Sequence, residues 1–319
     1  MDKLSVIVPC YNEEKSVMLF YIELCKVICR MNHTEFEILF VDDGSSDKTR
    51  EIIERIATQD ARVFFLSFSR NFGKEAAIYA GLKHVSGSYV VVMDVDLQDP
   101  PSLLPEMYQI LQTGQYDCVA TKRSTRTNEP PVRSMFAHGF YKLFHKCTGL
   151  KVADGARDFR MMTRNMADCI AEMPEHGRFS KGIFAWVGFE TKWLEFENKK
   201  RVAGETKWSF MKLLGYAFEG LTAFSFAPLH LSTLFAVLFF AAFVIFTLFC
   251  MFSPTTRPFS ALTGLILAVA SLQFFVIGIL GQYLSKIALE NKRRPHYIIK
   301  KTNLNNQKQI MPESRCGFR

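Results

Sequence analysis

The sequence predicts an α/β domain with a mostly parallel sheet, followed by a two-helix transmembrane hairpin near the C-terminus. Short β-branched apolar runs alternate with helical stretches over the N-terminal part, which is typical of parallel sheets buried on both faces. A long segment nearly free of charge comes later. The chain of 319 residues is 49% hydrophobic and 22% charged, which argues against disorder, collagen-like repeats and disulfide scaffolds.

The alternation defines the elements of the first domain. The apolar runs that we expect to be strands are residues 4–8, 36–41, 63–68, 89–93 and 117–121. The intervening stretches that we expect to be helices are residues 14–30, 48–58, 74–85 and 101–113. Helix starts are indicated by Ser46 and Asp47, and by the prolines at 100 and 101.

The charge-poor segment predicts the membrane hairpin. Between Glu219 and Lys286 lie 66 residues, of which only Arg257 is charged. They form two apolar runs, 226–252 and 260–284, each longer than the ~20 residues that cross a hydrocarbon core as a helix. A pair of buried core helices is the alternative, but core helices seldom stay apolar on every side for this length.

Charges on either side of the two runs predict the orientation. Lys and Arg residues precede the first run and follow the second, so both chain ends should face the cytoplasm. No signal peptide is expected, because the apolar run 4–8 is short. The eight cysteines are expected to be reduced, with no zinc site. The predicted organisation is a cytosolic domain (1–200), a juxtamembrane amphipathic segment (201–225), spans at 226–252 and 260–284, and a basic cytoplasmic tail (286–319).

The net charge of +8 is concentrated in that tail. From Lys286 to Arg319 the chain has nine Lys or Arg and two acids, a balance of 9 − 2 = +7. This distribution suits anionic lipid headgroups and excludes a nucleic-acid footprint spread over a domain. Residues 134–147 and 208–218 are expected to be amphipathic helices at the membrane surface, with packing on the sheet as the alternative.

Polar residues gather where the predicted strands end, which is where open α/β sheets bind ligands. Asp94 and Asp96 leave a buried strand, and Gln98 follows them. Two carboxylates in that position need compensation, which Mg²⁺ or Mn²⁺ can supply while still binding substrate phosphate oxygens. Asp99, just before two prolines, is better explained as a helix cap. The sequence has no GxGxxG or Walker A loop.

Four segments resemble the inverting family 2 glycosyltransferases of GT-A fold, which have a Rossmann-like sheet: VIVPCYNE (6–13), VDDGSSD (41–47), RNFGKEAA (70–77) and MDVDLQDPP (93–101). The DLQDPP, GARDFRMM (155–162) and RVAGETKWS (201–209) segments and the hairpin are similar to the polyprenyl-phosphate sugar transferases of bactoprenol or dolichol-phosphate type. The resemblance covers residues 4 to about 286.

The resemblance implies a role for each matching residue. Nucleotide-sugar binding falls to Pro9, Tyr11, Glu13, Asp42 and Asp94. The divalent ion, Mg²⁺ or Mn²⁺, falls to Asp94, Asp96 and Gln98, and the lipid phosphate to Arg123, Arg133 and Arg201. Asp96 and Asp158 are the implied catalytic residues, with Asp158 as a base or a carboxylate that orients the acceptor. An ion pair of Asp158 with Arg157 or Arg160 is the structural alternative. Asp43 and Asp47 are assigned to turn and cap geometry.

The expected function is transfer of a sugar from UDP-glucose or a UDP-N-acetylhexosamine to polyprenyl (undecaprenyl) phosphate at the cell membrane, with inversion. A lipid phosphate is mostly a dianion at neutral pH, so it needs orientation more than deprotonation. The alternatives are a dolichol-phosphate mannose synthase that uses GDP-mannose, a processive polysaccharide synthase, and a non-catalytic lipid-binding scaffold. A homo-oligomer is a further expectation of the resemblance.

Overall fold

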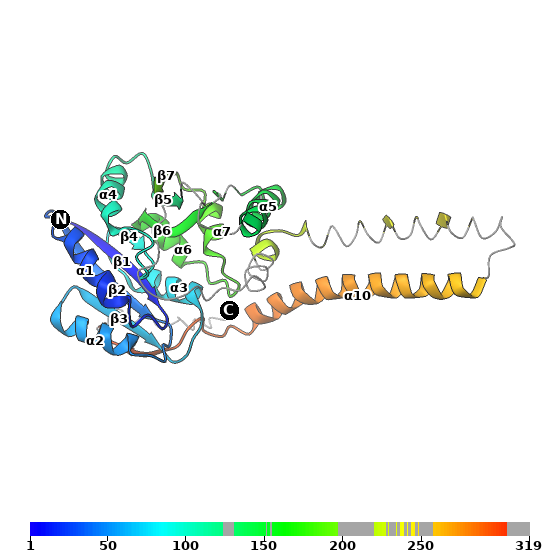
Figure 1. Ribbon diagram of the computed structural model, residues 1–319, viewed down its shortest axis with the longest axis horizontal. Coiled ribbons are helices and arrows are strands. Elements are labelled where there is room, and N and C mark those ends of the chain that lie inside the picture. The colour runs from blue at the N-terminus through cyan, green and yellow to red at the C-terminus, as the bar shows by residue number, and fades with distance from the viewer. Residues whose placement is uncertain are drawn as a thin grey trace, which may run out of the picture.

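The computed structural model describes residues 1–123, 131–150, 152, 153, 155–196, 220–227 and 258–304, with single positions between 229 and 248. Within these residues the core of the molecule is a sheet of eight strands in the order β7-β5-β6-β4-β1-β2-β3-β8. Helices cover both faces of the sheet, and one long helix, α10, projects away from it (Figure 1).

The sheet is mixed. The parallel part is formed by β1 (Asp2–Cys10), β2 (Thr34–Asp42), β3 (Val63–Phe68) and β4 (Tyr89–Val92). The half beyond β4 contains β5 (Cys118–Arg123), β6 (Ala156–Thr163) and β7 (Thr191–Phe196). Strand β6 is antiparallel to both β4 and β5, whereas β7 is parallel to β5. The α/β class is therefore confirmed.

Two hydrophobic clusters hold the helices on the sheet. One face is covered by α1 (Val17–Ile28), α2 (Thr49–Gln59) and α4 (Leu104–Gln112), which follows a short 3₁₀ turn, η1 (Pro101–Leu103). The other face is covered by α3 (Lys74–His84), α6 (Arg164–Ala171) and α7 (Ser180–Trp186). Strands β1, β2 and β4 contribute to both clusters, so their runs are apolar on both sides.

All five predicted strands are present as β1 to β5, but the sequence did not predict the strands that follow them. Strands β6 and β7 lie in segments that sequence reasoning treated as a motif or left unassigned, because their apolar residues are interrupted by Arg157, Asp158, Arg160, Lys192 and Glu195. The helix expected at 14–30 begins only at Val17, because Ser16 and Val17 first form a turn on the carbonyl of Glu13. All six cysteines among the described residues are free.

Helix α10 (Pro258–Asn291) contains the second of the two expected membrane spans. Its stretch Ala268–Asn291 is the one helix in the described part of the chain that is long and apolar enough to cross a membrane, and only 6% of its most apolar window is buried. The exposed side chains include Ile266, Phe274, Ile277 and Leu284. The first expected span, 226–252, lies largely outside the described residues, so the hairpin is not confirmed.

The first part of the expected basic tail (286–319) belongs to the folded domain as far as residue 304, where the described residues end. After α10 it returns to the domain, where β8 (Ile299–Thr302) pairs with the edge strand β3 in antiparallel fashion. The side-chain amide of Asn303 accepts a hydrogen bond from the Phe65 N–H at 2.8 Å and donates one to the Val63 carbonyl at 3.1 Å. These contacts join the end of α10 to the β3 edge of the sheet.

Helix α5 (Pro131–Thr148) contains the segment expected at the membrane surface. Its Phe144 is 1% exposed, and its ring centroid lies 5.6 Å from that of Phe179 and 6.2 Å from that of Phe224. The helix therefore packs on α7 and on the segment that leads toward the first apolar run. The other expected surface helix, 208–218, lies outside the described residues.

Replacing Gly44 with alanine is expected to destabilise the fold by several kcal/mol. Gly44 has φ +67°, and an added Cβ would lie 2.4 Å from the backbone carbonyl carbon of Arg70. Gly114 is the matched control, because it has φ +71° with open space around it. Left-handed backbone costs about 1 kcal/mol in either variant, and overpacking adds about 1–3 kcal/mol at residue 44 alone. Chemical denaturation measures both; equal losses would contradict the close approach of the two loops.

Replacing His296 with glutamine is expected to flatten the acid dependence of stability. Burial, together with His176 and Arg178, lowers the pKa of His296 to about 4. The neutral ring is stacked on His176 at 4.1 Å, and Glu290 accepts from the His176 N–H. Because the folded pKa lies below the ordinary value of about 6.5, this stability is full above pH 6.5 and is lost as the pH falls toward 4.

The measurement is thermal unfolding across this pH range. The wild type should lose more stability than the His296→Gln variant, whereas His33→Gln at an exposed position should behave as wild type. Parallel curves for wild type and His296→Gln would refute the effect.

Candidate active site

The loops that follow β1 and β2 are tied together at the carboxyl edge of the sheet. The Asp43 N–H donates to the Cys10 carbonyl at 2.8 Å, and the Asn12 N–H donates to the Ser45 hydroxyl at 2.9 Å. Asn12, with φ 54°, returns the contact by accepting from the Ser46 N–H at 2.8 Å. This bonding fixes the expected nucleotide-binding segments relative to one another.

Of the residues implied for the nucleotide, Pro9 is buried at the end of β1, and Tyr11 is exposed beyond it. Glu13 is half-buried, and its carboxylate accepts from the Ser16 hydroxyl at 2.9 Å. Asp42 ends β2 and is 1% exposed. Its two oxygens accept from the Ser45 N–H at 3.0 Å and the Ser67 hydroxyl at 2.8 Å.

Asp43 has the turn-forming role that its position suggested. Its carboxylate accepts from the backbone N–H groups of Phe72 and Gly73 at 2.6 and 2.9 Å, which holds the loop after β3. Burial raises the pKa of Asp43 to about 6, although the two amide donors act in the opposite direction. The loop that this carboxylate holds leads directly into Lys74.

The residues implied for the metal lie after β4. Asp94 is partly exposed, whereas Asp96 is 8% exposed and accepts from the Gln98 N–H at 3.1 Å. Leu97, between Asp96 and Gln98, has φ 56°. This conformation is uncommon for leucine and often marks a functional turn. The turn keeps Asp94, Asp96 and Gln98 together at one edge of the sheet.

Lys74, the first residue of α3, joins the two halves of the site. Its ammonium lies 2.7 Å from a carboxylate oxygen of Asp94 and 2.5 Å from one of Asp158. Asp158 lies on β6, two residues before Arg160, and Arg160 pairs with Val92 of β4. The antiparallel course of β6 therefore brings Asp158 beside Asp94.

Charge pairing dominates the electrostatics of this cluster. Burial alone would raise the pKa of Asp158, but Lys74, Lys181 and Arg160 outweigh it and hold that pKa well below its usual range. Burial would likewise lower the pKa of Lys74, but Asp158 and Asp94 raise it well above the ordinary value. Asp158 is therefore a carboxylate, and Lys74 an ammonium ion, throughout the physiological pH range.

Asp99 is not a helix cap, which corrects the sequence-based assignment. No side-chain bond caps the 3₁₀ turn, and Asp99 is fully buried, with Oδ1 2.8 Å from Nε of Arg157. The same guanidinium donates to the amide oxygen of Gln98 at 3.3 Å. Burial raises the pKa of Asp99, and Arg157 counteracts this. Neither arginine expected to pair with Asp158 does so directly; among the described residues, Asp158 forms its ion pair with Lys74.

The arginines implied for the lipid phosphate are less fully defined. Arg123 is the last residue of β5, in register with Phe196 of β7, and Arg133 belongs to α5. The side chains of both, and all of Arg201, lie outside the described residues.

Sequence reasoning missed three cations of the site: Lys74, Arg157 and Lys181. Lys74 stands inside RNFGKEAA, directly after a strand-end loop, and that position was the available signal. Arg157 was considered only as a partner of Asp158. Lys181, whose ammonium donates to the Ala156 carbonyl at 2.9 Å, gave no local signal, because α7 comes from a distant part of the chain.

The donor chemistry of this edge fits a divalent ion that is shared with a substrate. No group of three or more His, Cys, Asp or Glu side chains in the described part of the chain is arranged to hold a metal. Asp94, Asp96 and Gln98 offer hard oxygen donors, and Mg²⁺ is commonly bound by one or two carboxylates together with substrate phosphates. The residues therefore fit a metal whose coordination is completed by a diphosphate.

Comparison with known proteins identifies the family. Residues 5–171 match the model of glycosyl transferase family 2, and relatives at 38–40% identity cover almost the whole chain. The chain belongs to glycosyl transferase family 2.

Two of these relatives share a description. The prophage bactoprenol glucosyl transferase homolog of Escherichia coli (strain K12) is 38% identical over 304 residues, 94% of this chain and 99% of that protein. The SfII prophage-derived bactoprenol glucosyl transferase of Shigella flexneri is 40% identical over 311 residues, 95% and 99% of the two chains. A solved glucosyl-3-phosphoglycerate synthase from Mycobacterium tuberculosis, in complex with Mn²⁺, UDP-glucose and phosphoglyceric acid, is 18% identical with a TM-score of 0.46, covering 68% of this chain and 76% of that one.

Proposed function

We propose that this protein transfers a sugar from a UDP-linked donor to the phosphate of a polyprenyl lipid, with inversion at the anomeric carbon. The observation that carries the proposal is the Asp94–Lys74–Asp158 cluster at the carboxyl edge of the sheet, in a family 2 chain similar to bactoprenol glucosyl transferases over nearly its full length. Glucose is the sugar that the names of these relatives favour.

The donor would lie across the joined loops after β1 and β2. Pro9, Tyr11 and Glu13 would border the nucleoside, and Asp42 would accept from the uracil N3–H with a remaining lone pair. The bonds of Ser45 and Ser67 to Asp42 support this role, because they fix the carboxylate and leave each oxygen with further acceptor capacity.

Asp94, Asp96 and Gln98 would hold Mg²⁺ or Mn²⁺ against the diphosphate. When bound, such an ion neutralises the negative charge that develops on the departing nucleoside diphosphate. Lys74 is the cation next to Asp94 in this structure, and Arg157 bonds to Gln98. Both side chains would orient these oxygen donors toward the diphosphate.

Asp158 would act as a fixed negative charge beside the anomeric carbon. Its pKa is held well below the usual range by Lys74, which makes it a weak base at neutral pH. An acceptor that is already a phosphate dianion needs no proton removed. Glycosyl transfer develops positive charge on the sugar ring, which a carboxylate stabilises. The role of orienting and stabilising therefore fits Asp158 better than that of a base.

Arg123, Arg133 and Arg201 would bind the lipid phosphate, and the membrane segments would keep the site beside the bilayer. The exposed apolar length of α10 supports a membrane anchor. A hairpin with spans at 226–252 and 260–284 would leave the catalytic domain and both chain ends in the cytoplasm, as the flanking Lys and Arg residues favour.

A donor panel tests the proposal. The full chain in detergent is incubated with Mg²⁺ or Mn²⁺, undecaprenyl phosphate and one radiolabelled nucleotide sugar at a time. Transfer of label to lipid from a UDP-sugar, abolished by a chelator, is the expected result. Transfer from GDP-mannose would favour the mannose-synthase alternative, and no transfer from any donor would refute the enzymatic function.

A further inference from the structure

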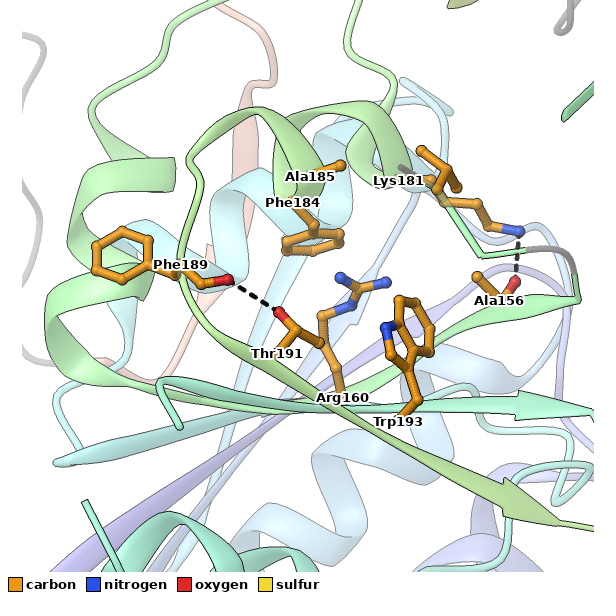
Figure 2. Close-up of a pocket in the computed structure, with 9 residues that line it drawn as sticks. Ala156, Arg160, Lys181, Phe184, Ala185, Phe189, Thr191 and Trp193 are labelled. Atoms are coloured by element: carbon orange, nitrogen blue, oxygen red, sulfur yellow. Dashed lines mark hydrogen bonds between the residues drawn. The ribbon is translucent and has the colours of Figure 1, made fainter. Parts of the chain in front are cut away.

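A pocket lies beside the proposed catalytic site, under α7. Its volume is about 150 Å³, and it is lined by β6, β7 and α7 and by residues that adjoin them, including Val152 and Phe189 (Figure 2). We call it the α7 pocket. Ala120 of β5 is in register with Arg160 on one side and Trp193 on the other. Residues opposite one another in a ladder share a face, so the small alanine leaves a space between two large side chains.

The α7 pocket contains a buried cation that is incompletely bonded. Arg160 is 3% exposed, and its guanidinium carbon lies 3.6 Å from the centre of the Phe184 ring. One Nη donates to the Arg157 carbonyl at 3.1 Å, but Nε is buried without a hydrogen-bond partner among the described residues. Figure 2 shows the guanidinium between the Phe184 ring and the Trp193 indole. Asp158 and Glu75 offset part of the charge of Arg160, but within the described part of the chain the buried Nε–H donor still lacks an acceptor, which is costly unless a ligand supplies one.

Lys181 supplies a second cation and links the pocket to the catalytic cluster. Its ammonium donates to the Ala156 carbonyl at the wall of the pocket. The same positive charge helps to lower the pKa of Asp158. None of the residues that line the α7 pocket is acidic. The lining therefore presents two positive charges and aromatic rings, and it lies within electrostatic reach of Asp158.

These features select the chemical class of the ligand. The pocket has two cations and no acidic residue in its lining, and the Arg160 Nε–H lacks an acceptor among the described residues, so an anion with acceptor oxygens is the ligand that fits this lining best. A volume of about 150 Å³ has room for a phosphate group. Arginine binds phosphate through two parallel N–H donors, and the free Nε–H of Arg160 leaves such a donor available.

The position of α7 indicates where the phosphate comes from. Helix α7 also contacts the segment that leads toward the first apolar run: a Cβ on Gly182 would lie 2.6 Å from the Phe224 ring. The Phe179 ring also lies 6.3 Å from that of Phe224. The helix that lines the pocket thus contacts the chain that is expected to lead to the membrane, where a lipid phosphate has to remain.

We propose that the α7 pocket is a binding site for a phosphate monoester dianion, held by Arg160 and Lys181, and that the phosphate is that of the lipid acceptor. This inference rests on the proposed function and adds β6 and α7 to the acceptor side of the site. Arg160 and Lys181 would draw the phosphate toward Asp158.

Fluorescence of Trp193 reports on the pocket directly. In the full chain, Trp186 and Trp208 are replaced by phenylalanine, which leaves Trp193 as the single tryptophan. The probes are farnesyl phosphate, farnesol and inorganic phosphate, added separately to protein in detergent. Farnesyl phosphate should give a saturable change in emission, and farnesol none.

Variants identify the ligands. Lys181→Met and Arg160→Lys should each weaken farnesyl phosphate binding at least tenfold and raise the acceptor KM, with the KM of the nucleotide sugar unchanged. Lys192→Met is the control, because Lys192 is exposed, adjacent to Trp193 in β7 and on its opposite face. Should the buried Arg160 variant fail to fold, Lys181→Met on the surface of α7 carries the test alone.

The outcomes of this experiment separate the phosphate site from the proposed function. Unchanged farnesyl phosphate binding in the Lys181 variant would overturn the proposal, as would the absence of any Trp193 response. Equal affinity for inorganic phosphate and farnesyl phosphate would identify a free-phosphate site and overturn the acceptor role. Binding of farnesyl phosphate that depends on Lys181, without sugar transfer from any donor, would support the pocket and refute the proposed function instead.

Discussion

Replacing Asp158 with asparagine is expected to lower kcat at least about 100-fold while nucleotide binding survives. The substitution keeps the shape of the side chain but removes the negative charge beside the reacting centre. Lys74 pairs with two carboxylates in the described structure, Asp94 and Asp158. The substitution leaves it with Asp94 alone. Turnover with saturating donor and acceptor measures kcat, and calorimetric titration with UDP measures binding.

Asp168→Asn is the matched control for this prediction. Asp168 is exposed on α6 and pairs only across one helical turn with Arg164 in the described structure, at 3.1 Å. It should leave turnover unchanged, because exposed pairs of this kind contribute little. Wild-type kcat in the Asp158 variant would show that the Lys74–Asp158 pair is only structural.

Replacing Asp96 with asparagine is expected to remove most metal-dependent transfer, with a loss of at least about 100-fold at a fixed Mn²⁺ concentration, or about 3 kcal/mol of transition-state stabilisation. Asp96 is 8% exposed and bonded to the Gln98 N–H, so its carboxylate is fixed before any substrate binds. An asparagine at that position offers the metal a single, uncharged oxygen ligand. Electron paramagnetic resonance of Mn²⁺ in the presence of UDP measures the affinity independently of turnover.

The Asp168→Asn variant serves here as well, since it makes the same chemical change on an exposed helix. An unaltered Mn²⁺ affinity in the Asp96 variant would exclude Asp96 as a metal ligand. A weakened affinity that higher Mn²⁺ concentrations overcome would support the assignment and separate it from damage to the fold.

Local patterns were sufficient to predict the first half of the fold. The β-branched runs of β1 to β4 are buried on both faces, and nothing in them competes with that pattern. Strand β6 could not be found in the same way, because its first residues are charged. These charges are accommodated in a strand because each has a partner. Arg157 pairs with Asp99 and Asp158 with Lys74, and the Arg160 guanidinium lies over the Phe184 ring. Those partners lie far away in the sequence.

The site was predictable to the extent that it follows from strand ends. Asp42, Asp94 and Asp96 lie at the sheet edge where parallel strands place them. Their partners follow from the order of the strands, which the sequence pattern does not contain. Lys74 reaches Asp158 only because β6 inserts antiparallel between β4 and β5. Asp99 was assigned to a cap because local capping rules take no account of a partly buried arginine 58 positions later.

The return of the chain from α10 to β8 was equally invisible in the sequence. Residues 299–302 are too short and too basic to be recognised as a strand, and they pair only because β3 offers an open edge. The stacking of Tyr297 on Phe68, with centroids 5.1 Å apart, adds an apolar contact to the join. The catalytic domain is consequently fixed to the end of the apolar helix, and α10 extends outward from that point (Figure 1).

The most direct measurement is the analysis of the product formed from UDP-glucose and undecaprenyl phosphate by the purified chain with Mn²⁺. Nuclear magnetic resonance of the isolated lipid should show one glucose joined to the phosphate in the β configuration, with one UDP released for each lipid glycosylated. Release of UDP with free glucose and no lipid product would contradict the proposed acceptor. An α-linked lipid product would contradict inversion.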